Sequence, residues 1–149
     1  MNVKKYIDHT ILKPEATSKD IRQLCSEAAE HQFAAVCVNP CYVELAAHLL
    51  KGTKVKVATV VGFPLGANLS LVKAFEAKQA ILQGADEIDM VINIGAAKAG
   101  LWDAVLTDIK QVVAAAAGCT VKVIVETALL SEDEKKQVCQ IVLVSGAHY

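Results

Sequence analysis

The chain has 149 residues, of which 54% are hydrophobic and 21% charged, and its formal net charge is −1. This composition excludes intrinsic disorder, which needs low hydrophobicity and high net charge, and the near-neutral charge gives no field to hold nucleic acid or an anionic membrane. Aromatic residues make up 5% of the chain, too few for a surface that stacks nucleic-acid bases. We therefore expect one domain over residues 1–149 with a buried core.

The N-terminus and the cysteines predict a cytoplasmic protein. Residues 1–8 have a basic start but no apolar segment behind it, so we expect no signal peptide. The five cysteines show no Cys-x-x-Cys spacing, which favours reduced thiols over a disulfide framework. Cys37, Cys41 and His48 fit no ordinary zinc pattern, so we expect neither a metal nor a cofactor.

Short apolar runs alternate with helical patterns along the chain. The first pattern predicts a helix over 18–31, capped by Thr17 or Ser18. Strands are then predicted over 34–38, 55–61, 87–92 and 121–125, and helices over 40–50, 69–83, 102–117 and 131–144. The last of these helices is expected to open with Ser131 as its cap. Strands of about five residues separated by helices predict βαβ crossovers and a parallel sheet.

Two segments outside this alternation are informative. Asp8-His9-Thr10, before the first predicted helix, is more typical of a cap or turn than of a catalytic dyad. Residues 145–149 have the same form as residues 83–87, which lead from a helix into a strand. We therefore expect His148 and Tyr149 to open a further strand, and the sequence to be cut within it.

Charged residues inside two predicted strands are the strongest candidates for chemistry. Buried parallel strands are normally apolar throughout, yet Asp89 lies in the third predicted strand and Lys122 in the fourth. Sequential strands are usually adjacent, so these two side chains can lie side by side. One interpretation is a buried ion pair that fixes the register. The other is an acid and an amine tuned against each other in a pocket at the strand ends.

Other candidates carry weaker signals. Residues 62–66 match neither Gly-x-Gly-x-x-Gly nor a P-loop, and indicate a tight turn. Cys37, at a strand end, could line a pocket, although a buried structural thiol is the more common case. Glu126 and Thr127 could contact a substrate or cap the next turn.

Taken in order, several motifs make the chain resemble the deoxyribose-phosphate aldolase family over essentially its whole length. They are Ile7-Asp8-His9-Thr10-Ile11-Leu12-Lys13-Pro14, Val36-Cys37-Val38-Asn39-Pro40, Val61-Gly62-Phe63-Pro64-Leu65-Gly66, Ala85-Asp86-Glu87-Ile88-Asp89-Met90-Val91-Ile92-Asn93 and Val121-Lys122-Val123-Ile124-Val125-Glu126-Thr127.

The resemblance implies an α/β fold made of the parallel βα units of a TIM (β/α)8 barrel, here about the first four plus an N-terminal helix. It implies a metal-free class I aldolase of nucleotide catabolism. Such a lyase cleaves 2-deoxyribose 5-phosphate to acetaldehyde and glyceraldehyde 3-phosphate through a lysine Schiff base. By resemblance, Asp89 takes part in proton relay with Lys122 beside it. Asp8 would orient a second lysine, and Thr10, Leu12 and Cys37 would line the pocket.

The chain departs from the family in one respect. In the family a Lys-Thr-Ser-Thr-Gly-Phe-like motif on the fifth strand carries the Schiff-base lysine, which would fall two residues beyond Tyr149. We therefore expect little or no activity from this chain alone. We also expect association through exposed strand edges, either with itself or with the missing half.

Three other functions stay open. Lys122 could substitute as the Schiff-base amine. The chain could be a non-catalytic module derived from the aldolase, which self-associates or binds a sugar phosphate. The strand count alone also permits a flavodoxin-like sheet with a regulatory role.

Overall fold

The computed structural model describes residues 3–149. Residues 1 and 2, the start of the basic N-terminal segment, lie outside the described residues. The chain divides into two compact units, Met1–Val60 with Ala80–Glu87 (unit 1) and Val61–Gln79 with Ile88–Tyr149 (unit 2). The single domain over 1–149 stays a prediction.

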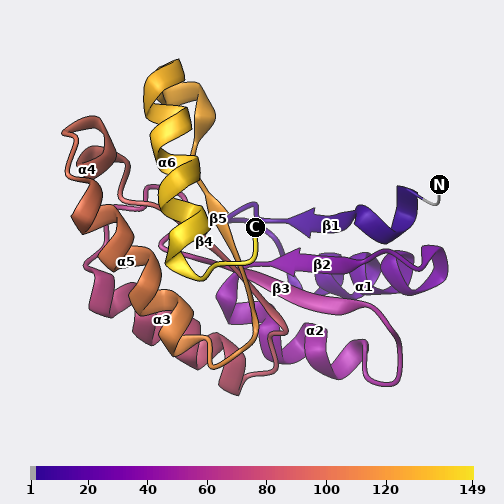
Figure 1. Cartoon of the computed structure of the whole chain (residues 1–149). Helices are drawn as coiled ribbons and strands as arrows, with labels where there is room; N and C mark the ends of the chain where they lie inside the picture. Colours follow the sequence, from indigo (N-terminus) through magenta and orange to yellow (C-terminus); the bar gives the residue numbers. More distant parts are fainter. Residues whose placement is uncertain (1–2) are drawn as a thin grey trace. The chain divides into compact units, whose positions relative to one another are not determined.

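Five parallel strands alternate with helices, in the α/β class that the sequence predicts (Figure 1). They follow one another across the sheet in chain order, as sequential βα units do. The strands are β1 Asp8–Ile11, β2 Ala35–Val38, β3 Lys56–Val61, β4 Glu87–Val91 and β5 Thr120–Ile124.

Six α-helices and three 3-10 turns connect the strands over the described part of the chain. The α-helices are α1 Ser18–His31, α2 Val43–Leu49, α3 Ser70–Leu82, α4 Ile94–Lys98, α5 Trp102–Ala115 and α6 Glu132–Ser145. The 3-10 turns are η1 Val3–Tyr6, η2 Pro40–Tyr42 and η3 Thr127–Leu129. All five predicted helices and all four predicted strands are present, with ends shifted by a few residues.

The segment Asp8–Ile11 corrects one prediction, because it is a strand rather than a cap or turn. The helix Ser18–His31 therefore belongs to a first strand–helix unit and is not an additional N-terminal helix, so the chain holds five such units instead of about four. The strand escapes prediction because Asp8, His9 and Thr10 are polar and lack the apolar run of a central strand. β1 lies at one end of the sheet order, where polar side chains are tolerated.

In unit 1 the parallel register sorts the strand residues onto two faces. Thr10, Cys37 and Ala58 are partners across β1, β2 and β3, and so are His9, Val36 and Val57. Side chains alternate along a strand, so the two sets point to opposite faces. Helix α1 packs on the face of the second set, with its apolar side buried through Ile21, Leu24, Cys25 and Ala28. Burial raises the pKa of the Cys25 thiol to about 11.

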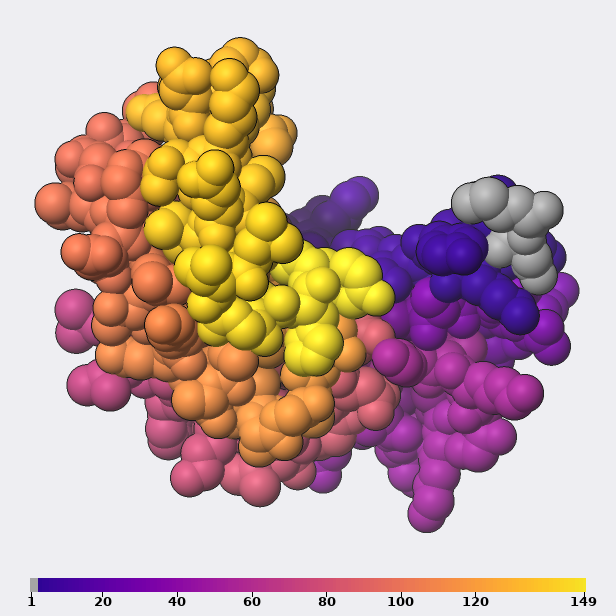
Figure 2. Space-filling view, in the orientation of Figure 1, coloured from indigo at the N-terminus to yellow at the C-terminus, as the bar shows by residue number. Residues whose placement is uncertain are grey.

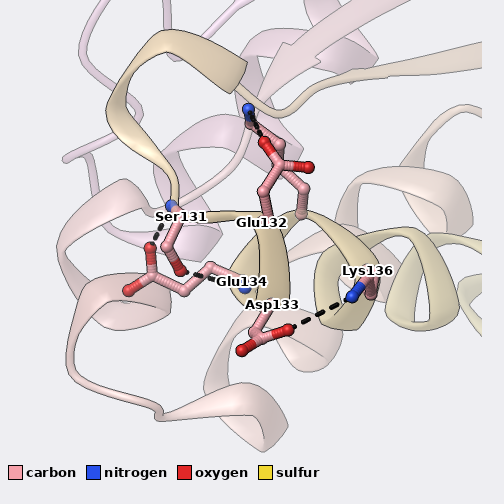
Figure 3. Close-up of polar contacts among 6 residues, drawn as sticks. Ser131, Glu132, Asp133, Glu134 and Lys136 are labelled. Carbon is pink, nitrogen blue, oxygen red and sulfur yellow. Dashed lines mark hydrogen bonds and ion pairs between the residues drawn. The ribbon is translucent and has the colours of Figure 1, made fainter.

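In unit 2 the start of α6 is fixed by a capping box (Figure 3). The Glu134 carboxylate accepts the Ser131 N–H over 2.7 Å, and the Ser131 hydroxyl accepts the Glu134 N–H over 3.3 Å. These bonds satisfy two peptide N–H groups at the helix start, which confirms the predicted serine cap. The Glu134 carboxylate also pairs with Lys98 at 2.8 Å, so the same residue joins α6 to α4.

The last two residues of the sequence pair with the backbone of β5. The His148 N–H donates to the Val121 carbonyl over 2.9 Å, and the Tyr149 carbonyl accepts the Val123 N–H over 2.8 Å. These bonds are those of a neighbouring parallel strand, as expected for residues that open one. Tyr149 is 76% exposed. Figure 2 shows the C-terminal part of the chain, in yellow, on the visible surface.

The loop after β3 packs tightly against the end of β4 within unit 2. The Gly62 N–H donates to the Glu76 carboxylate over 2.8 Å, and the Gly66 N–H to the Gly62 carbonyl over 2.7 Å. A β-carbon on Gly66 would lie 1.7 Å from the Ile92 carbonyl oxygen, and Gly66 has φ +65°. Glycine is therefore required at this position both by the backbone conformation and by the close approach.

Substituting Gly66 tests this packing. We expect Gly66→Ala to lower the free energy of unfolding by about 3 kcal/mol, since it adds a backbone clash to the strain of a positive φ. Gly100→Ala is the matched control, because Gly100 has φ +71° and nothing lies within 4 Å of the added carbon. It should cost about 1 kcal/mol, from strain alone. Equal losses in urea unfolding would show that the approach to Ile92 is unimportant.

Candidate functional site

Two predicted binding residues, Thr10 and Cys37, lie side by side on neighbouring strands of unit 1. They are partners in the β1–β2 ladder, and Asp8 precedes Thr10 by two residues and shares its face. The Thr10 hydroxyl donates to the Asp8 carbonyl oxygen over 2.8 Å. Thr10 is exposed and Cys37 is buried. This face of the sheet therefore presents a carboxylate and a hydroxyl beside a buried thiol.

Leu12, the fourth predicted binding residue, packs against the buried cluster around Cys37. The cluster consists of Ala35, Cys37, Ala58 and Val60, all from alternate positions of β2 and β3. Its side chains are small and apolar, so the sheet face beside Thr10 is lined by methyl groups and one thiol. The structure thus brings Thr10, Leu12 and Cys37 together in unit 1, with Asp8 on the same face of the sheet. Their roles in binding stay a prediction.

His9 lies on the opposite face of β1 and has a structural partner there. Its Nε2 lies 2.7 Å from a carboxylate oxygen of Glu27 on α1, and its ring packs 5.2 Å from the ring of Phe33. Hydrogen bonds from His9 and Gln23 hold the pKa of the Glu27 carboxyl below its usual range. Because Asp8 and His9 point to opposite faces, they form no dyad, and His9 joins the strand to its covering helix.

The two predicted catalytic residues meet in unit 2. The Lys122 ammonium lies 3.1 Å from a carboxylate oxygen of Asp89, with 23% and 15% of the side chains exposed. The neighbours of Asp89 along β4, Ile88 and Met90, are fully buried. The adjacency predicted from strand order is confirmed. A carboxylate and an amine at this distance, both partly open to solvent, can pass a proton to and from a bound molecule.

The ends of β4 and β5 hold this pair in place. The Ile92 N–H donates to the Ile124 carbonyl over 3.2 Å, which fixes the two strands just beyond Asp89 and Lys122. The other acidic residue of β4, Glu87, pairs in unit 1 with Lys56 at 2.8 Å. Each acidic residue of β4 is therefore paired with a lysine of another strand, as a buried carboxylate requires.

An open apolar groove of about 540 Å³ lies in unit 2 at the carboxyl ends of the strands. Its lining comes from the loops that follow β3, β4 and β5, and consists of Pro64, Leu65, Ala67, Ile94, Glu126, Ala128 and Leu129. The carboxyl ends of parallel strands are where α/β folds place their binding sites. Glu126, one of the weaker candidates, lies at this groove.

Sequence reasoning missed a second ion pair, between Lys73 of α3 and Asp108 of α5. The Lys73 ammonium lies 2.6 Å from Asp108 Oδ2, and the two side chains are 0% and 3% exposed. A signal was available, because Lys73 stands in line with the buried Ala77 and Ala80 at helical spacing. A lysine in the buried stripe of a helix needs a buried anion.

Neither a metal cluster nor a membrane span is found over residues 3–149. No group of three or more His, Cys, Asp or Glu side chains in this range is placed to hold a metal ion. No helix in the same range is long and apolar enough to cross a bilayer. No disulfide joins the five cysteines.

Comparison with known proteins decides the family. The model of the DeoC/LacD family aldolases matches residues 2–147. The chain belongs to this family. It is 59% identical to the deoxyribose-phosphate aldolase of Streptococcus suis (strain 98HAH33) over 149 residues, which are 100% of this chain and 68% of the relative.

Superposition on solved structures supports the same family assignment. A chain from Coccidioides immitis superposes with a TM-score of 0.96 at 41% identity, over 98% of this chain and 58% of that chain. The deoxyribose phosphate aldolase from Aeropyrum pernix superposes with a TM-score of 0.90 at 31% identity, over 97% and 61%. The chain therefore spans about two thirds of the length of the curated relative and about 60% of the length of these two solved chains.

A double-mutant cycle measures the coupling in the Asp89–Lys122 pair. We expect Asp89→Asn and Lys122→Met each to lower the free energy of unfolding by about 1–2 kcal/mol, because each removes one side of a partly buried ion pair. The double variant should cost clearly less than the sum of the two.

The exposed pair Asp133–Lys136 is the control, since its side chains are 95% and 74% exposed. Its coupling energy, from Asp133→Asn and Lys136→Met, should stay below about 0.5 kcal/mol. Additive losses at Asp89 and Lys122 would contradict a coupled pair.

Proposed function

We propose that the chain is the N-terminal part of a deoxyribose-phosphate aldolase. The proposed enzyme is a class I lyase that cleaves 2-deoxyribose 5-phosphate to acetaldehyde and glyceraldehyde 3-phosphate. The observation that carries the proposal is the contact between Asp89 and Lys122 at 3.1 Å, on the two strands where the family motifs place them. The 59% identity to the Streptococcus suis aldolase supports it.

The chemistry of a class I aldolase explains why an acid and a second amine are needed. The nucleophilic amine must be neutral to attack a carbonyl, and a nearby cation such as Lys122 lowers its pKa. Protons must then be moved as the carbinolamine loses water and the enamine forms. Asp89, partly exposed and beside Lys122, is assigned this proton transfer.

The face of β1 and β2 is assigned to substrate binding. Thr10 offers a hydroxyl to the sugar hydroxyls, and Asp8 offers a carboxylate that orients a second lysine. Leu12 and the small side chains around Cys37 offer an apolar surface to the acetaldehyde methyl group.

The nucleophile of this reaction comes from another segment. The Lys-Thr-Ser-Thr-Gly-Phe-like motif does not occur among the 149 residues. We therefore assign the Schiff-base amine to a segment that completes the barrel. The proposed reaction uses no metal, and the proposed location of the protein is the cytoplasm. Alone, residues 1–149 should show little or no turnover.

A fusion tests the function. Residues 1–149 are joined in frame to the C-terminal third of the Streptococcus suis aldolase, and cleavage of 2-deoxyribose 5-phosphate is followed by a coupled assay of glyceraldehyde 3-phosphate. We expect turnover in the fusion, and a fall in kcat of about 100-fold or more in the fusion with Asp89→Asn, because a proton-transfer group is lost.

Asp133→Asn in the same fusion is the control, since this side chain is 95% exposed, pairs with Lys136 and belongs to no proposed site, so kcat should stay unchanged. A folded fusion without turnover would overturn the proposal. Saturable binding of 2-deoxyribose 5-phosphate without turnover would instead favour the sugar-phosphate-binding module. Trapping with acetaldehyde and borohydride on residues 1–149 distinguishes the variant mechanism, in which the adduct is found at Lys122.

We also propose that the chain associates with itself through its open strand edge. Alternate peptide groups of β1 face β2, starting at the Ile7 carbonyl, which accepts the Ala34 N–H. Residues 8 and 10 therefore direct their peptide groups to the edge that no described strand covers. Such an edge is a template for pairing with another chain. The Aeropyrum pernix relative is tetrameric, so a protein of this family can form an oligomer.

Light scattering on residues 1–149 at micromolar concentration checks this association. We expect a species larger than a monomer, and its loss in Thr10→Pro, which removes an N–H from the open edge without touching the β1–β2 bonds. Thr10→Ala is the control, since it removes the same hydroxyl but keeps the N–H. A strictly monomeric protein, or equal behaviour of the two variants, would contradict association through β1.

A further inference from the structure

The buried ion pair of unit 2 contacts the backbone at the carboxyl end of β4. Besides its contact with Asp108, the Lys73 ammonium donates to the carbonyl oxygen of Val91 over 2.9 Å. Val91 is the last residue of β4 and lies two residues after Asp89. Lys73 therefore reaches from α3 to the strand that carries the proposed proton-transfer group.

The peptide group between Val91 and Ile92 is held from both sides. Its carbonyl accepts from Lys73, and its N–H donates to the Ile124 carbonyl of β5 over 3.2 Å. The two bonds leave this peptide plane little freedom to rotate. Rotation of this plane would turn the end of β4 and, with it, the direction of the Asp89 side chain toward Lys122.

The path of the Lys73 side chain is also built into the fold. A β-carbon on Gly62 would lie 2.9 to 3.2 Å from the Lys73 side-chain carbons Cε, Cδ and Cγ. The methylene stem therefore passes directly over Gly62 at the end of β3, where any larger residue would push it aside. The stem therefore carries the ammonium to the Val91 carbonyl.

Stability alone does not account for this pair. Burying two charges carries a large desolvation cost, and replacing such a pair with apolar residues of similar volume is often neutral or stabilising. The other Asp108 oxygen, Oδ1, is buried without a hydrogen-bond partner among residues 3–149, which adds to the cost. The Val91 bond, by contrast, needs a donor with the reach of lysine, and a buried ammonium needs an anion.

We propose that Lys73 is a positioning residue, which fixes the Val91 carbonyl so that Asp89 meets Lys122, and that Asp108 serves to hold the Lys73 ammonium in place. The importance of Lys73 for proton transfer by Asp89 rests on the proposed aldolase function. The geometric claim does not, because it concerns contacts that can be measured without turnover.

The test uses residues 1–149 and two readouts by NMR: the titration of the Asp89 carboxyl and the hydrogen exchange of the Ile92 amide. In Lys73→Met/Asp108→Leu the charges are removed as a pair, which favours folding, while the Val91 carbonyl loses its donor. We expect Ile92 exchange to rise about tenfold, the effect of one lost hydrogen bond, and the Asp89 titration to move away from the wild-type curve.

Asp108→Asn separates positioning from general loosening. It removes the negative charge but keeps a side-chain oxygen that can accept from the Lys73 ammonium, so Lys73 is still held and can donate to Val91. Both readouts should therefore stay near the wild type even though the protein unfolds at lower urea. If the double variant fails to fold, Lys73→Met alone replaces it, because it also removes the donor to the Val91 carbonyl. Lys98→Met/Glu134→Gln is the control for removing an ion pair elsewhere in unit 2.

Unchanged Asp89 titration in a folded double variant would overturn the proposal. Equal changes in Asp108→Asn and the double variant would also overturn it, since the effect would then follow stability rather than the Val91 bond. Both results are independent of turnover, so they are distinguishable from failure of the aldolase function, which the fusion assay reports.

Discussion

The hydrogen-bonded register of parallel strands is the constraint on which the functional geometry depends. A register shift by one residue would send every side chain of a strand to the other face. The alignment of β1 with β2 places Thr10 beside Cys37, and the bond between Ile92 and Ile124 joins β4 and β5 just past Asp89 and Lys122. Neither group of residues is close in sequence, so the sheet alone brings each group together.

The two ion pairs of unit 2 illustrate how surroundings separate structural from chemical roles. Lys73 and Asp108 are almost completely buried, so no substrate can reach them. Asp89 and Lys122 keep 15% and 23% of their side chains exposed, enough for contact with a small molecule while water is partly excluded. The same charge types therefore suit a buried contact between helices in one place and, in the other, the proton transfer that we propose.

The apolar central strands, the serine cap of α6 and the Asp89–Lys122 pair could all be predicted, because each has a local signal in composition or alternation. β1 could not, since Asp8, His9 and Thr10 carry no apolar run and the strand forms through bonds to β2. The face shared by Thr10 and Cys37 was therefore expected through the family resemblance alone. The Val91 contact of Lys73 depends on the side chain crossing Gly62, which no sequence pattern reports.

The distribution of cysteines makes the chain suitable for spectroscopic labelling after one substitution. Burial raises the pKa of the Cys25 thiol to about 11, so this thiol stays protonated at neutral pH and resists alkylation. Cys41 in unit 1 and Cys139 in unit 2 are exposed and available to a thiol-reactive probe. With Cys119, which is half-buried, replaced by serine, these two thiols can carry a spin-label pair. The distance between the labels would report directly on the arrangement of the two units in solution.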